Sequence, residues 1–116
     1  AVEIAVGPIK LLVLDLGETD PKTAQALVDE KTAGRADLMV LAATAAGGKV
    51  LFVAKAGKDA VAAGAHAGDL LKTVARIAGG GGGGRAEFAT AGGRDASKIA
   101  DALAAAEPTL RNAVGE

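Results

Sequence analysis

The sequence contains six consecutive glycines at residues 79–84, followed directly by Arg85. A second glycine pair, Gly92 and Gly93, directly precedes Arg94. Glycine lacks a Cβ, so it can adopt positive φ and leaves its backbone N–H groups uncovered. Backbone of this kind can enclose a phosphate or lie flat against a ribose-phosphate chain. We therefore interpret the glycine run as a loop that lets a phosphate-bearing ligand approach the main chain.

A flexible linker is the usual interpretation of a glycine-rich stretch. Only 32 residues follow the run, and segments shorter than about 40 residues seldom fold alone without metals or disulfides. The sequence has no cysteine and a single histidine, His66, so a disulfide or a tetrahedral Cys/His zinc site cannot form. We expect the run to lie inside one domain, where a disordered loop remains the alternative to a ligand-contacting one.

Two known glycine-loop signatures do not match the run. A phosphate-binding Walker loop ends in Gly-Lys followed by Ser or Thr, whereas this run ends in Gly84, Arg85 and Ala86. The dinucleotide fingerprint requires glycines that follow a strand and open a helix, whereas these glycines follow a predicted helix. Neither nucleotide-binding motif is therefore present.

Basic residues are concentrated around the glycines. Residues 70–98 carry five basic and two acidic side chains, while the chain as a whole has a net charge of −1. Such clustering is typical of a phosphate-binding face, although three excess charges also fit an ordinary solvated surface. We expect Arg85 and Arg94, next to the glycines, to contact phosphate or ribose. The full candidate set is Gly79, Gly80, Gly81, Gly82, Gly83, Gly84, Arg85, Gly92, Gly93, Arg94, Lys72, Arg76 and Lys98.

Strand and helix patterns alternate in the part of the chain before the glycines. Apolar runs at 11–16, 38–43 and 49–56 are typical of strands, and the last two are joined by a Gly-Gly turn that suits a hairpin. Between the first two strands, Asp20 and the proline after it are typical of an N-cap and a first helical residue. Gly34 is expected to end that helix.

A loop follows, and residues 67–78 then place apolar side chains on one face of a second helix. The glycine run comes next, with a short strand expected within 85–93. Asp95 is expected to cap a last helix, which Glu107 and Pro108 end before one or two further turns. The pattern predicts a single α/β domain, a mixed β-sheet with helices packed on it and a glycine-rich loop after the second helix.

Composition limits both the core and the location of the protein. Alanine fills 29 of the 116 positions and glycine 17, so the core is expected to be thin, with backbones close together. The uncharged stretch at 38–48 is 11 residues long, well short of the roughly 20 that span a bilayer. We expect no membrane association. The chain does not begin with methionine, which favours a fragment of a longer protein.

The block from His66 to Gly93, HAGDLLKTVARIAGGGGGGRAEFATAGG, resembles the C-terminal DHH-associated domain of alanyl-tRNA synthetases. In that family an AGEL helix leads into a glycine run, an arginine and an AQAGG segment. The strand and helix patterns upstream also resemble that domain, so the likeness covers nearly the whole chain. Two departures are Asp69, where the family usually has Glu, and Thr90, where Gln is common.

The resemblance implies that residues 1–116 are a single C-terminal domain that binds the outer corner of tRNA(Ala), where the D and T loops meet, and supports aminoacylation and editing. The parent would be an ATP-dependent class II ligase of the cytoplasm. Its ATP, Mg and Zn sites would lie outside this segment, so no cofactor and no catalysis are expected here. The implied partners are tRNA, the other domains of the parent and a second copy in a homodimer.

Arginine-flanked glycines suit an RNA corner, which presents folded shape, 2′-hydroxyls and phosphates. The sequence has neither Trp nor Tyr, so the stacking surfaces left are Arg guanidinium planes, bare peptide planes and Phe88. Two alternatives remain: a dimerisation module of the same enzyme, and the substrate-binding domain of a DHH-type phosphoesterase. In the latter a histidine that contacts phosphate normally follows the glycine run, where this sequence has Arg85.

Overall fold

Six strands form one twisted sheet in the computed structural model of the chain, which describes residues 2–116. The strand order is β1-β2-β3-β4-β6-β5. Only the β2–β3 pair is parallel, so the sheet is mixed, as the sequence predicts. The strands are β1 Ile4–Val6, β2 Ile9–Asp15, β3 Leu38–Ala46, β4 Lys49–Ala56, β5 Gly81–Gly84 and β6 Phe88–Gly93.

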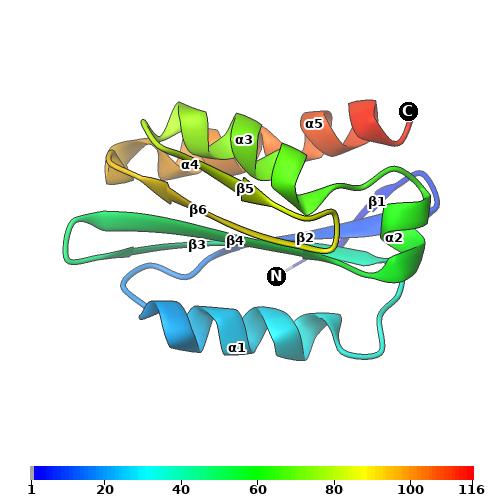
Figure 1. Cartoon of the computed structure of the whole chain (residues 1–116), viewed down its shortest axis with the longest axis horizontal. Helices are drawn as coiled ribbons and strands as arrows, with labels where there is room; N and C mark the ends of the chain where they lie inside the picture. Colours follow the sequence, from blue (N-terminus) through cyan, green and yellow to red (C-terminus); the bar gives the residue numbers. More distant parts are fainter. Residues whose placement is uncertain (1) are drawn as a thin grey trace.

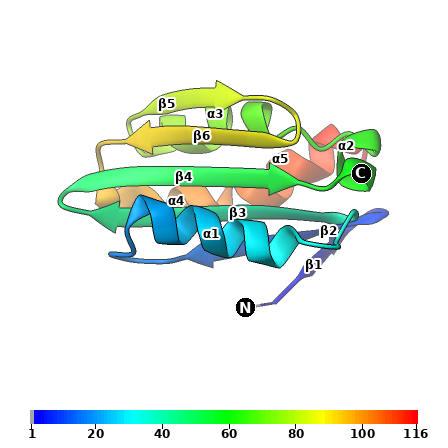
Figure 2. The same cartoon turned by 60° about the horizontal axis from the view of Figure 1, so that its bottom comes forward.

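Helices cover both faces of the sheet, so the domain has three layers (Figure 1). The helix α1 lies alone on one face, over β3 and β4, while α3, α4 and α5 lie on the other (Figures 1 and 2). Because α1 does not extend over the hairpin of β5 and β6, that end of the sheet is uncovered on the α1 side (Figure 2). The helices are α1 Pro21–Thr32, α2 Lys58–Ala62, α3 Ala67–Ile77, the 3-10 turn η1 Ala96–Lys98, α4 Ile99–Ala104 and α5 Ala106–Ala113.

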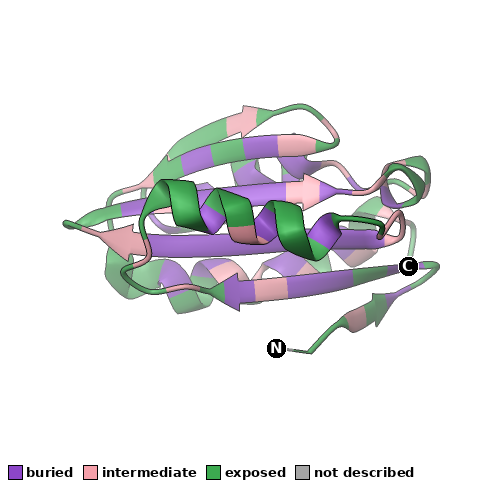
Figure 3. Ribbon diagram, turned by 90° about the horizontal axis from the view of Figure 1, so that it is seen from below, coloured by how far each residue is buried: buried purple, intermediate pink, exposed green. Residues whose placement is uncertain are grey.

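The sheet separates two hydrophobic clusters. The larger lies under α3, α4 and α5 and includes Phe52, which is fully buried, together with many alanines. The smaller lies under α1 and includes Val28 and Val53. The central strands are buried along most of their length, whereas β5 at the edge is mostly exposed (Figure 3). The alanines of the larger cluster let α3, α4 and α5 approach the sheet closely, which agrees with the alanine-rich composition. The cluster under α1 consists mostly of leucines and valines.

Several predicted elements are confirmed. Asp20 is the N-cap of α1, where its side chain accepts the Thr23 N–H at 3.0 Å, and the proline stands at the first helical position. The hairpin of β3 and β4 turns at Gly47 and Gly48. The second predicted helix, α3, ends one residue before the expected position, and Asp95 caps η1, which leads directly into α4.

The structure corrects three expectations. The pattern did not reveal β1, a three-residue edge strand, or α2, a five-residue helix in the expected loop. Pro108 does not end the last helix, because α4 stops earlier at Ala104 and Pro108 lies in the first turn of α5. Proline has no N–H to give to the carbonyl four residues before it, Ala104, and its ring crowds that carbonyl. In a first turn the missing donor costs nothing.

The expected glycine-rich loop is also corrected, because residues 81–84 form the edge strand β5. Gly79 has φ +74° and ends α3. Its N–H donates to the Arg76 carbonyl at 3.1 Å, and the Gly80 N–H donates to the Ala75 carbonyl at 2.9 Å. These two bonds make a Schellman motif. The run therefore serves two successive purposes, a helix cap and then a strand, and neither leaves it disordered.

Within residues 2–116, every helix is too short or too polar to cross a bilayer. The predicted domain range, 1–116, includes one residue, Ala1, outside the described part of the chain.

Asp20→Ala is expected to destabilise the fold, because the carboxylate caps α1. The hydrogen bond from the Thr23 backbone holds the pKa of Asp20 below its ordinary value of 3.8. A lowered folded-state pKa stabilises the fold above pH 3.8, and that contribution is lost as the pH falls through the folded-state value. Urea midpoints followed by circular dichroism should therefore differ most between wild type and variant near neutral pH and converge in acid.

Glu30→Ala, on the exposed face of α1, is the control and should change the midpoint at pH 7 much less. Equal midpoints for wild type and Asp20→Ala at pH 7 would contradict the capping role.

Candidate nucleic-acid interface

The β5–β6 hairpin is hydrogen-bonded to both ends of α3. At the start of the helix, the Ala67 N–H donates to the Ala86 carbonyl at 2.8 Å and the Gly68 N–H to the Arg85 carbonyl at 3.0 Å. At the end of the helix, the Ala78 carbonyl accepts the Arg94 N–H at 2.9 Å and the Asp95 N–H at 3.0 Å. The segments at the two ends of the hairpin therefore pair with backbone N–H and carbonyl groups that a helix leaves unpaired at its termini.

This arrangement requires the helix and the hairpin to have equal lengths. Ten residue steps of α3, from Gly68 to Ala78, span about 15 Å at the rise of an α-helix. Five steps of β6, from Phe88 to Gly93, span about 17 Å at the rise of a strand. Because the two lengths match, α3 and the hairpin form one unit that fixes where the sequence-predicted site residues lie.

Close approach of main chains explains part of the glycine run. A Cβ at Gly82 would lie 2.6 Å from the Ala91 Cα, and a Cβ at Gly68 would lie 2.3 Å from the Gly84 carbonyl oxygen. Both distances are shorter than any side chain tolerates. A Cβ at Gly81, by contrast, would have nothing within 4 Å. The fold thus explains why Gly82 and Gly68 lack side chains but gives no such reason for Gly81.

The free edge of β5 carries unpaired backbone groups. The Arg85 N–H donates to the Phe88 carbonyl at 2.9 Å and closes the hairpin. In an antiparallel pair of strands, facing residues alternate between hydrogen-bonded and non-hydrogen-bonded pairs. Because Arg85 and Phe88 are hydrogen-bonded, the facing pairs Gly84↔Ala89 and Gly82↔Ala91 are not. The backbone N–H and carbonyl groups of Gly82 and Gly84 therefore point away from β6. Of the six N–H groups of the glycine run, the helix cap and the sheet leave only those of Gly82 and Gly84 unpaired. A glycine loop would instead have left all six exposed.

The structure brings the two predicted glycine clusters together. Gly79, Gly80 and Gly81 lie beside Gly92 and Gly93, and with Arg94 they line an open hollow of about 420 Å³. Apart from Arg94, its lining is bare main chain. A hollow of peptide groups with one guanidinium at its rim is suited to an anionic, backbone-like ligand such as a sugar-phosphate.

Three further predicted cations lie on α3, which packs on the hairpin, and on η1, which follows the hairpin in the chain. Lys72 and Arg76 are exposed one turn apart on α3, and the Lys72 Cε lies 3.6 Å from where a Cβ of Gly83 would be. Lys98 is exposed on η1, four residues beyond Arg94. Within residues 2–116, Arg76, Arg94 and Lys98 form no ion pair, and Lys72 makes only a 3.9 Å contact with Asp69.

Arg85 lies apart from Arg94 and from the glycine-lined hollow. It stands at the opposite end of the hairpin from Arg94, and its Nε contacts the Glu87 Oε1 at 2.8 Å. Its side chain is still 76% exposed. The two arginines therefore do not meet in one loop, because β5 and β6 separate them by the length of the hairpin, and their predicted contacts with phosphate or ribose stay a prediction.

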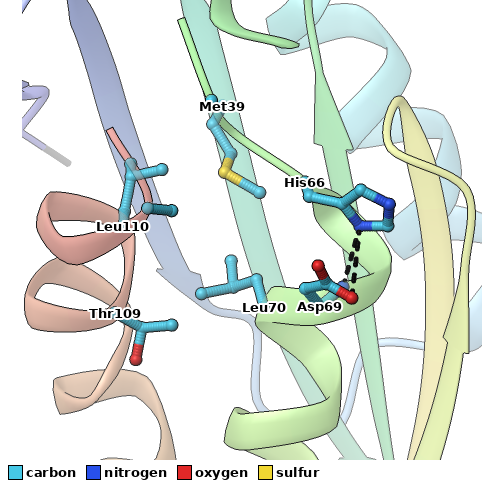
Figure 4. A pocket seen from close by; sticks show the side chains of 8 residues that line it. Met39, His66, Asp69, Leu70, Thr109 and Leu110 are labelled. Carbon is cyan, nitrogen blue, oxygen red and sulfur yellow. Dashed lines mark hydrogen bonds and ion pairs between the residues drawn. The ribbon is translucent and has the colours of Figure 1, made fainter. Parts of the chain in front are cut away.

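The single histidine has a structural role. His66 is the N-cap of α3, and its Nδ1 accepts the Asp69 N–H at 3.0 Å, with the Asp69 carboxylate 3.7 Å away (Figure 4). It stands at the rim of a mostly apolar pocket of about 70 Å³ that Met39 and Leu110 also line. No three His, Asp or Glu side chains of residues 2–116 are grouped so that they could hold a metal ion.

The sequence patterns did not single out Gly68, whose contact with Gly84 lets α3 lie directly on the glycine strand. A glycine inside a helical pattern is the signal that could have indicated this close approach.

Residues 9–112 match the family model described as the DHHA1 domain. The chain belongs to the DHHA1 domain family. Among its relatives, the alanine–tRNA ligase of Synechococcus elongatus is 41% identical over 113 residues, which is 96% of this chain and 13% of the relative. The ligase of Acetivibrio thermocellus is 54% identical over 65 residues, 56% of this chain and 7% of the relative. This DHHA1 domain thus spans only about an eighth of the first of these relatives.

A solved structure has the same fold. The C-Ala domain from Aquifex aeolicus alanyl-tRNA synthetase superposes with a TM-score of 0.84 at 27% identity, covering 96% of this chain and 99% of that one. Sequence and fold together confirm the resemblance: this DHHA1 domain corresponds to the C-terminal domain of alanyl-tRNA synthetases.

Two alanine substitutions in β5 should differ in their effects on the free energy of unfolding. Gly82→Ala forces a Cβ against the β6 backbone and should cost about 1–3 kcal/mol. Gly81→Ala meets open space and should leave the free energy of unfolding unchanged or raise it by about 0.4–1 kcal/mol, since it restricts the unfolded chain. Urea denaturation of both variants measures the difference. Similar losses in the two would contradict the close packing of β5 on β6.

Proposed function

We propose that this domain binds the elbow of tRNA, the corner formed by the D and T loops, through the glycine-lined hollow and the cations around it. The observation that carries the proposal is the juxtaposition of Gly79–Gly81, Gly92–Gly93 and Arg94 in one open hollow. The correspondence to the C-terminal domain of alanyl-tRNA synthetases supports tRNA(Ala) as the RNA.

The chemistry of the hollow favours recognition of shape over recognition of base sequence. Bare peptide groups let an RNA backbone come closer than any side chain would allow, and Arg94 supplies a guanidinium that can pair with a phosphate. Lys72 and Arg76 add positive charge along α3. Folded RNA presents phosphates and 2′-hydroxyls at such a corner, and these groups carry shape rather than sequence.

The proposed role within the parent enzyme is to hold the tRNA while other domains act on its acceptor end. The parent is then an ATP-dependent alanine–tRNA ligase in the cytoplasm, which this domain helps in aminoacylation and editing. Catalysis and the ATP, Mg and Zn sites are assigned to other domains, so residues 1–116 form its C-terminal, non-catalytic tRNA-binding part.

Arg94→Gln should weaken tRNA binding about tenfold, since a charge-assisted hydrogen bond to phosphate contributes about 1.5 kcal/mol or more. It should also lower the slope of log K against log salt by about 1. Gly81→Val, whose Cβ would have nothing within 4 Å, should weaken binding by blocking close approach of the RNA backbone. Filter binding or gel shifts with tRNA(Ala) at several salt concentrations measure both effects.

Lys10→Gln is the matched control, because Lys10 is an exposed cation on β2, three strands away from the hairpin. It should bind tRNA like the wild-type domain. If all three variants bind equally well, the hollow is not the RNA site.

A homodimer is a second candidate, favoured by the unpaired backbone groups of Gly82 and Gly84. An open strand edge of this kind can pair with the same edge of a second copy. Sedimentation equilibrium should then show a dimer, and hydrogen exchange should show protection of those two amides as concentration rises. A monomer at all concentrations would contradict this role.

The phosphoesterase alternative has less support. Its phosphate-contacting histidine would stand where Arg85 lies, and Arg85 is at the far end of the hairpin from the hollow, beside Glu87. The ligase relatives also favour a synthetase parent.

A further inference from the structure

A second hollow, of about 410 Å³, lies at the opposite end of the hairpin from the glycine-lined one. Its lining residues come from α1, β4, the segment that joins β5 to β6 and the start of β6. The α1 side of the sheet is uncovered beside the hairpin, beyond the reach of α1 (Figure 2). The lining of this hollow combines one aromatic ring with two acidic, two basic and one amide side chain: Phe88, Asp29, Glu87, Lys55, Arg85 and Gln25.

Phe88 provides the flat apolar surface of this hollow. The sequence contains two phenylalanines and neither tryptophan nor tyrosine, and the other phenylalanine, Phe52, is fully buried. Phe88 is only partly buried and packs at the border of the cluster under α1. Its position is fixed by pairing with Lys55 on β4 and by the hydrogen bond from the Arg85 N–H to its carbonyl.

The charged groups around Phe88 neutralise one another. Lys55 Nζ lies 2.9 Å from Asp29 Oδ1, and Arg85 Nε lies 2.8 Å from Glu87 Oε1. The hollow thus has no net charge, in contrast to the glycine-lined hollow, whose single charged group is Arg94. Two carboxylates oppose the entry of a phosphate, while N–H donors and carboxylate acceptors remain at the rim for a neutral ligand that offers both.

A planar neutral group with apolar faces and a polar edge fits these features best, and a nucleobase has this chemistry. Bases stack on aromatic side chains and are read by hydrogen bonds along their edges when RNA presents them unpaired. An aliphatic side chain of a peptide would use the ring but leave the polar rim without a partner.

We propose that the hollow at Phe88 takes one unpaired nucleobase of the bound RNA, stacked on the phenyl ring. The inference rests on the proposed RNA-binding function and extends it. The two hollows lie about 17 Å apart along β6. A backbone segment at Arg94 and a splayed-out base at Phe88 can therefore belong to the same RNA, with the exposed Thr90 between them.

Nucleosides without phosphate test the hollow directly. With only two phenylalanines, the ring signals of Phe88 and Phe52 can be followed separately by NMR. At least one of four nucleosides at millimolar concentration, adenosine, guanosine, cytidine or uridine, should shift the Phe88 ring signals. The ring signals of buried Phe52 should stay unchanged. Inorganic phosphate should leave the Phe88 ring signals unchanged. If no nucleoside moves the Phe88 ring signals, the proposal is overturned.

Binding of tRNA provides the second test. Phe88→Leu keeps an apolar group against the cluster under α1 but removes the stacking surface, and it should weaken tRNA binding about tenfold. The slope of log K against log salt should stay as in the wild type, because no charge is lost. Val2→Ala, which trims an exposed apolar side chain just before β1, at the opposite edge of the sheet from the hairpin, is the control and should bind normally.

The outcomes separate this proposal from the function on which it rests. If Arg94→Gln weakens tRNA binding but Phe88→Leu does not, the base site is overturned and the RNA-binding role stands. If the wild-type domain does not bind tRNA, the proposed function fails. The proposal that Phe88 holds a base of bound RNA then fails as well, even if a nucleoside shifts the Phe88 ring signals.

Discussion

The fold depends on one constraint, the bonding of α3 to both ends of the β5–β6 hairpin. Four hydrogen bonds join the helix ends to the hairpin, two at each terminus, and they are possible because helix and hairpin have nearly the same length. The two main chains also touch, with Gly68 against Gly84. A side chain at Gly68 would push the helix off the strand and break the bonds at its ends, and a side chain at Gly84 would strike the backbone of β6. The glycines are thus first a packing requirement of this unit.

The same unit divides the proposed binding surface into two chemically different ends. One end has bare glycine backbone and Arg94, and the other has Phe88 between two ion pairs. Positive charge without a carboxylate partner favours a phosphate, whereas balanced charge beside a ring favours a neutral planar group. A rigid hairpin keeps these ends a fixed distance apart, so a ligand must match both their chemistry and their separation. In the proposed function, this fixed separation is what lets a small domain with few large side chains recognise a folded RNA.

This DHHA1 domain spans only a small share of the length of the ligases it resembles. Its single histidine illustrates how its polar residues serve the fold, since His66 caps α3. The two hollows at the ends of the hairpin offer bare main chain with Arg94 at one end and Phe88 among paired charges at the other. Such a surface is suited to holding a large ligand in place, because its contacts are spread over the hairpin and not concentrated in one deep pocket.

The sequence by itself determined the order and type of most elements. Asp20 with its proline, the Gly47–Gly48 turn and the apolar face of α3 are local signals, and they act through bonds within a few residues. The resemblance in the block around the glycines likewise identified the family. Tertiary structure alone decided that residues 81–84 form a strand, because glycine has no strand preference of its own and is held there by β6 and α3. It also decided that Arg94 joins the glycine hollow while Arg85 lies beside Phe88, since strand pairing sets which residues meet and residue spacing cannot.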